Sequence, residues 1–177
     1  MAHGNARGGH CYTARMSFEA LALTGSKPEQ YAQLLQQALA LLHGERDRIA
    51  NAANLSALVY NALPDLNWAG FYFFDGKELV VGPFQGLPAC VRIPLDKGVC
   101  GAAAQTRQTQ RIDDVHAFPG HIACDSASNS ELVVPLVAAD GALLGVFDLD
   151  SPLPGRFSVE DQQGLEAIAR AYLESLQ

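Results

Sequence analysis

The sequence predicts an α+β domain with a central antiparallel sheet and helices packed mainly on one face. Two long segments with helical periodicity come first, at residues 28–44 and 45–63. Two pairs of strand-like segments with Gly-containing turns follow, and a last helical segment starts at Ser158. Because such short turns join antiparallel strands, we expect hairpins rather than parallel crossover units.

Composition limits both the size of the core and the kind of partner. The chain has 177 residues, a length that suits one domain with a proper core. Its net charge of −7 at pH 7 argues against nucleic acid and anionic membranes as general partners. No run of about 18 apolar residues occurs, so no membrane-spanning helix is expected.

The first residues differ in composition from the rest of the chain. We expect residues 1–26 to be a flexible leader and residues 27–177 to form the domain. The leader lacks the apolar segment of a signal peptide, which predicts a reducing, cytoplasmic location. In such a compartment thiols are more often catalytic, metal-binding or buried than disulfide-bonded. The chain has four of them, Cys11, Cys90, Cys100 and Cys124, of which Cys11 is expected to be exposed and incidental.

The helices have recognisable ends. Pro28 stands where the first turn of a helix tolerates proline, and Gly44 can end that helix. The second helix is expected to end at Pro64. Ser158 opens the last helix, with Asp161 three residues later in a variant of the capping box.

The first predicted hairpin is rich in aromatic residues. Residues 67–74 read as a strand in which Trp68, Gly70 and Tyr72 share one face. A turn at Asp75-Gly76 leads back through residues 77–81. The middle of the chain is then expected to contain a strand at 90–93, a small helix at 99–107, a brief strand at Ile112 and a long loop over 113–130.

The second predicted hairpin carries the acids. Its strands are residues 131–137 and 142–150, and Glu131 opens the first of them. Asp148 and Asp150 lie two residues apart and therefore point the same way. Two acids on one strand face repel each other unless a cation or a shared proton lies between them. The alternative is a strand face that is simply exposed to solvent.

Several kinds of chemistry remain open for the cysteines. Cys100 follows Gly98 near a helix start, where the helix dipole lowers a thiol pKa, whereas acidic neighbours would raise that of Cys124. Buried, inert thiols are the simplest alternative. A zinc site from His116, His121 and Cys124 is disfavoured because the spacing contains no tight ligand pair. No G-x-S-x-G, G-x-G-x-x-G or Walker-type motif occurs.

Taken together, the motifs resemble those of the GAF-domain enzymes that reduce free methionine-(R)-sulfoxide, over residues 27–176. Cys90 and Cys100 are ten residues apart, and Cys124 follows 24 residues later, as in that family. The motifs that carry the resemblance are NWAGFYF (67–73), GPFQGLPAC (82–90), IPLDKGVCG (93–101), IDDV (112–115), HIACD (121–125), ELVVP (131–135) and GVFDLDS (145–151).

The resemblance implies a single GAF domain and a role for each site residue. Cys124 is the implied nucleophile, Cys90 the main resolving cysteine and Cys100 a second or alternative thiol. The implied substrate-binding residues are Trp68, against the S-methyl group, and the acids Glu131, Asp148 and Asp150. The resemblance further implies thioredoxin as the electron donor, a homodimer, and neither metal nor other cofactor.

The chemistry of these residue types agrees with the implied reaction. A sulfoxide oxygen is a poor leaving group, so attack at sulfur needs an acid, and clustered carboxylates can retain the proton. The same cluster can hold the ammonium of a free amino acid. Two other functions stay open: a GAF module that binds a small ligand such as a cyclic nucleotide without turnover, and a redox sensor with a Cys90–Cys124 switch. The lack of an effector domain in this sequence argues against a sensor.

Overall fold

The computed structural model describes residues 21–120 and 126–177. Their elements, in chain order, are α1 (Lys27–Leu42), α2 (Arg48–Ala62), β1 (Trp68–Phe74), β2 (Leu79–Gly86), β3 (Arg92–Ile93), α3 (Gly98–Thr106), β4 (Gln110–Ile112), the 3-10 turn η1 (Val115–Ala117), β5 (Ser130–Val137), β6 (Leu143–Ser151) and α4 (Val159–Ser175). No helix in these two ranges is long and apolar enough to cross a membrane.

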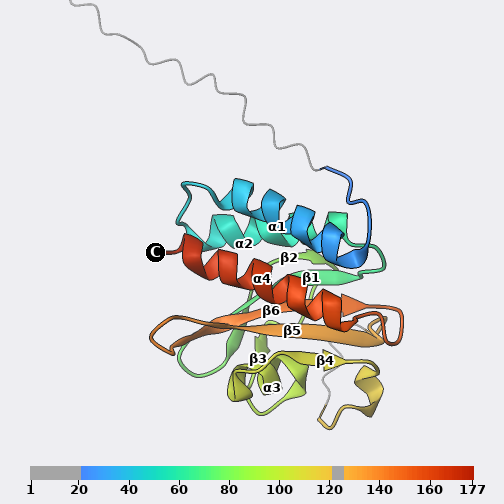
Figure 1. The fold of residues 1–177 in the computed structure, drawn as a ribbon. Coiled ribbons are helices and arrows are strands. Elements are labelled where there is room, and N and C mark those ends of the chain that lie inside the picture. The colour runs from blue at the N-terminus through green and yellow to red at the C-terminus, as the bar shows by residue number, and fades with distance from the viewer. Residues whose placement is uncertain (1–20, 121–125) are drawn as a thin grey trace, which may run out of the picture.

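The strands form a single antiparallel sheet in the order β3-β2-β1-β6-β5-β4. Helices α1, α2 and α4 cover one face, and the short helix α3 lies on the other (Figure 1). The predicted α+β class, the antiparallel sheet and the uneven distribution of helices are therefore confirmed.

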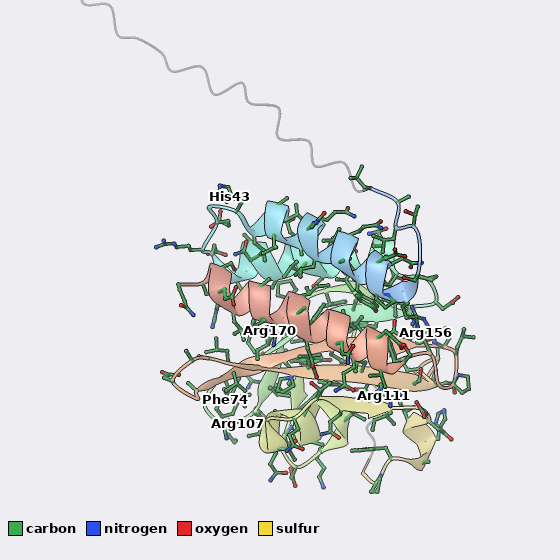
Figure 2. All side chains as sticks on the ribbon, viewed as in Figure 1. His43, Phe74, Arg107, Arg111, Arg156 and Arg170 are labelled. Atoms are coloured by element: carbon green, nitrogen blue, oxygen red, sulfur yellow. The ribbon has the colours of Figure 1, made fainter. Side chains whose placement is uncertain are left out.

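Strand alternation produces a separate apolar layer on each face of the sheet. Phe71 points toward the three long helices, where its ring stacks on Phe147 at 4.5 Å and meets Tyr172 at 4.8 Å. Trp68 and Tyr72 point toward α3 and join a second cluster that includes Cys100. Side chains fill both layers (Figure 2). The fold thus leaves one face of the central strands to a single small helix.

Some element bounds differ from those predicted, for physical reasons. Helix α2 starts at Arg48 because Asp47 caps it, accepting hydrogen bonds from the amides of Ile49 and Ala50. Strand β2 continues to Gly86 through Pro83, because the pairing register with β1 shifts there. Proline is tolerated in a strand at such an irregularity.

One predicted strand near a functional residue is also shorter than expected. The strand predicted over 90–93 shrinks to Arg92–Ile93, which leaves Cys90 in the connecting loop. Residues 21–26, assigned to the leader, form hydrogen bonds with α1: the Leu21 backbone with the Gln37 side chain, and the Thr24 backbone with that of Gln33.

A buried carboxylate ties the start of α4 to α1. Asp161 is 1% exposed and accepts hydrogen bonds from Lys27, the Tyr31 hydroxyl and Ser158. Burial alone would raise the pKa of Asp161, but these donors outweigh it and lower the pKa to about 2. Because the pKa of Asp161 is lower in the folded than in the unfolded chain, its ionised carboxylate stabilises the fold at any pH above the pKa of the unfolded chain. This stabilisation is lost as the pH falls toward about 2.

We therefore expect Asp161→Asn to reduce the free energy of unfolding by about 2 kcal/mol at pH 7, since it removes charged hydrogen bonds. The difference from the wild type should shrink as the pH drops below about 4. Urea unfolding at several pH values measures both. The matched control is Glu160→Gln on the exposed side of the same turn, which should change stability by less than about 0.5 kcal/mol. An equal effect of the two substitutions would contradict this role.

Candidate active site

The strand register aligns the predicted site residues across the sheet. Asp150 pairs with Trp68 of β1 on one side and with Glu131 of β5 on the other. Asp148 pairs with Gly70. Because directly opposed residues share a face, all of these residues lie on the side of the sheet that faces α3.

A cavity lies between this face and α3. It has a volume of about 30 Å³, and its described lining contains acids, a thiol, aromatic rings and apolar side chains but no lysine, arginine or histidine. The lining residues are Trp68, Tyr72, Leu87, Pro88, Ala89, Ile93, Gly98, Val99, Cys100, Ser128, Glu131, Asp148 and Asp150. Such a site suits a compact ligand with a cationic group.

Three polar side chains converge at the base of the cavity. Glu131 Oε1 lies 3.9 Å from Cys100 Sγ, and one donor atom from each of Cys100, Glu131 and Asp148 lies within 4.8 Å of the others. All three side chains are buried, and Asp148 Oδ1 has no hydrogen-bond partner. Asp150, by contrast, is half-buried. The cluster therefore contains a buried carboxylate oxygen that can accept a further hydrogen bond.

Burial changes the ionisation of both buried acids. It raises the pKa of Asp148 to about 7, although hydrogen bonds with Cys100 and Glu131 oppose the shift. Burial, followed by the charges of Asp148 and Asp150, raises the pKa of Glu131 well above its ordinary value. At neutral pH the cluster therefore retains a proton that it can donate.

The helix dipole does not lower the pKa of Cys100, contrary to the expectation from its sequence position. Cys100 does lie in the first turn of α3, but it is 3% exposed. Burial, then the charges of Asp148 and Glu131, raise its pKa well above the ordinary value. These effects oppose and exceed the dipole, so Cys100 remains a protonated thiol.

Aromatic rings lie beside the acids on the same face of the sheet. The indole of Trp68 stacks on Tyr72 at 5.6 Å and on Phe84 at 5.2 Å, and its Nε1 donates to the carbonyl of Leu87. Gly70 makes room for these rings, because a Cβ atom there would lie 2.3 Å from Phe84 Cβ. The rings provide a rigid apolar surface.

Sequence reasoning placed Tyr72 on the face of Trp68 but did not assign it to the site. Strand alternation could have assigned Tyr72 to the site, because it puts Tyr72 on the same face as Trp68. Burial, and then the charge of Asp148, raise the pKa of its hydroxyl, which therefore stays protonated. Ser128 was also missed. It is buried and accepts a hydrogen bond from the Asn67 side chain, and no motif marks it.

The remaining predicted residues lie at the edge of the cavity or outside the described chain. Cys90 is half-buried, packs beside the aromatic cluster and is disulfide-bonded. Cys124, His121 and Cys11 also lie outside them. His116 is exposed and its ring hydrogen-bonds to Asn129.

Known proteins place this geometry in context. A GAF-domain family model matches residues 50–174. The free methionine-R-sulfoxide reductase of Escherichia coli is 54% identical over 151 residues, covering 85% of this chain and 90% of the relative.

Two solved structures are similar in fold as well as sequence. A putative GAF sensor protein from Burkholderia vietnamiensis is 69% identical with a TM-score of 0.83, covering 85% of this chain and 95% of that one. The free methionine-R-sulfoxide reductase of Neisseria meningitidis, solved with its substrate, is 38% identical with a TM-score of 0.86. The match covers 90% of this chain and 96% of that one.

Proposed function

Since this chain belongs to the GAF-domain family, among relatives that include free methionine-R-sulfoxide reductases, we propose that it reduces free L-methionine (R)-S-oxide to L-methionine. The observation that carries the proposal is the buried acid cluster that lines one cavity together with the aromatic rings. The acids can bind the ammonium and protonate the sulfoxide oxygen. Trp68 and Tyr72 offer the S-methyl group an apolar surface.

In the proposed first step, the Cys124 sulfur attacks the sulfur of the sulfoxide. The S–O bond of the substrate breaks as a bond between this oxygen and the Cys124 sulfur forms, so that Cys124 becomes a sulfenic acid and the substrate sulfur gains two electrons as methionine leaves. The proton lost by the Cys124 thiol replaces the one that the acids donate. The proton held by Glu131 and Asp148 goes to the sulfoxide oxygen as the bond to sulfur breaks. The raised pKa of Asp148, about 7, supports this role.

In the proposed second step, the Cys90 thiol condenses with the sulfenic acid, forming a disulfide and releasing water. That Cys90 is disulfide-bonded supports a redox role for this cysteine. Thioredoxin then reduces the disulfide by thiol–disulfide exchange. Cys100 is buried beside the acids, where a protein reductant cannot reach it, so we assign it at most an alternative resolving role. The proposal also includes the homodimer implied by the resemblance and the cytoplasmic location predicted from the sequence, and light scattering tests the dimer.

The decisive assay couples the protein to thioredoxin, thioredoxin reductase and NADPH, with separated R and S epimers of free methionine sulfoxide. We expect NADPH oxidation with the R epimer and at least about 100-fold less with the S epimer, because the aromatic rings and the acids fix the orientation of the sulfoxide. A ligand-binding module or a redox sensor would oxidise no NADPH in response to the substrate.

Replacing the resolving cysteine should uncouple the two steps. We expect Cys90→Ser to release one methionine per site and then to stall with thioredoxin, because its sulfenic acid lacks its partner. Rapid quenching measures methionine per site, and steady-state NADPH oxidation measures turnover.

Cys100→Ser is the matched control for Cys90→Ser, because both remove one thiol from the same apolar cluster. It should retain both the first release of methionine and thioredoxin-dependent turnover. Full turnover by Cys90→Ser, with loss in Cys100→Ser, would move the resolving role to Cys100.

A further inference from the structure

The cluster of Cys100, Glu131 and Asp148 at the base of the cavity could bind a metal ion as well as donate a proton. Cys100 comes from α3, Glu131 from β5 and Asp148 from β6, and their donor atoms all lie within 4.8 Å of one another. Asp148 is 5% exposed, and its Oδ1 has no hydrogen-bond partner. A cation entering the cavity would satisfy this oxygen.

We propose that Cys100, Glu131 and Asp148 bind one Zn²⁺ ion, and that this ion inhibits the reduced enzyme. The inhibitory part rests on the proposed function, because it assumes that the same acids receive the substrate. Binding replaces the proton on the Cys100 sulfur with a Zn–S bond and releases that proton to solvent.

The donor types favour zinc over the other common divalent ions. Magnesium and calcium prefer sites made only of oxygen, whereas a thiolate combined with carboxylates suits Zn²⁺. In a tetrahedral zinc site the ligand atoms lie about 3.3–3.7 Å apart, given Zn–O and Zn–S bonds of about 2.0–2.3 Å. The separation of 3.9 Å between Cys100 Sγ and Glu131 Oε1 is close to this. Small side-chain movements complete the geometry.

Three protein ligands leave the fourth zinc position open to the cavity. The ion would take the carboxylate oxygens that the substrate ammonium and sulfoxide need. Zinc and methionine sulfoxide should therefore exclude one another. The inhibition should appear as a higher apparent KM with an unchanged kcat.

Direct binding tests the site without any catalysis. In a background in which Cys11, Cys90 and Cys124 are replaced by serine, Cys100 is the sole thiol. Competition with a chromophoric chelator should show one Zn²⁺ per chain with a Kd below about 10 µM. Cys100→Ala or Asp148→Asn in this background should weaken binding at least about 100-fold, whereas Glu160→Gln should leave it unchanged. Near-UV circular dichroism without metal confirms that each variant is folded.

A second measurement tests the inhibition. The rate of the first methionine release, before any reductant is needed, is compared with and without zinc for each variant. At a substrate concentration well below KM, we expect zinc to lower this rate at least tenfold in the wild type, and the ratio of the rates without and with zinc to be about one in Cys100→Ala. Zinc binding that is equal in Cys100→Ala, or unaffected by Asp148→Asn, would overturn the site. Cys100-dependent zinc binding in a protein that reduces no sulfoxide would support the site and refute the proposed function.

Discussion

Cys124→Ser is expected to abolish methionine release altogether, including the first turnover. A serine hydroxyl is far less nucleophilic than a thiol at neutral pH, and it cannot carry the oxygen as a sulfenic acid. Quenched-flow measurement of methionine per site gives the answer, and a sulfenic-acid probe should label the wild type after substrate but not the variant. The loss should reach the detection limit of the assay.

Cys100→Ser distinguishes the two candidate nucleophiles. Because burial and two acids hold the pKa of Cys100 high, we expect this variant to retain the first turnover. If Cys100→Ser stopped the first methionine release while Cys124→Ser did not, Cys100 would be the nucleophile. Substrate binding would then have to offset the raised pKa.

The sequence was sufficient to predict most of the fold, because local patterns determine its elements. Alternation put Trp68, Gly70 and Tyr72 on one face, and a Gly-containing turn joined the acid-bearing strands 131–137 and 142–150. The capping box at Ser158 marked the start of α4. The predicted ends of some elements were wrong where tertiary contacts determine them. One example is β2, which continues through Pro83 because its pairing with the neighbouring strand is irregular there.

The site was harder to predict, because it depends on contacts between elements far apart in the chain. The shared face of Asp148 and Asp150 follows from alternation alone. The approach of Cys100 to Glu131 does not, since it requires α3 to pack on the sheet. The same packing removes water from the thiol, and this is why a dipole argument based on sequence position gave the wrong direction for its pKa.

The second large effect concerns the form of the substrate. The described lining of the cavity has three acids and no basic side chain, so its electrostatic field favours a ligand that carries a cation. Free methionine sulfoxide has an ammonium, whereas its N-acetyl derivative and peptide-bound methionine sulfoxide have none. Without the ammonium, a desolvated carboxylate is left unpaired.

We therefore expect N-acetyl-methionine (R)-sulfoxide to be a poor substrate. Losing a hydrogen-bonded charge partner costs about 2–5 kcal/mol, which corresponds to a loss of roughly 30- to 4,000-fold in kcat/KM. Asp150→Asn should lower kcat/KM for the free amino acid much more than for the acetylated one, so the two substrates become more alike. Measuring both substrates with both proteins completes a double-mutant cycle for the ammonium contact. Similar kcat/KM values for the two substrates in the wild type would rule out an ammonium pocket and indicate that protein-bound methionine sulfoxide is also reduced.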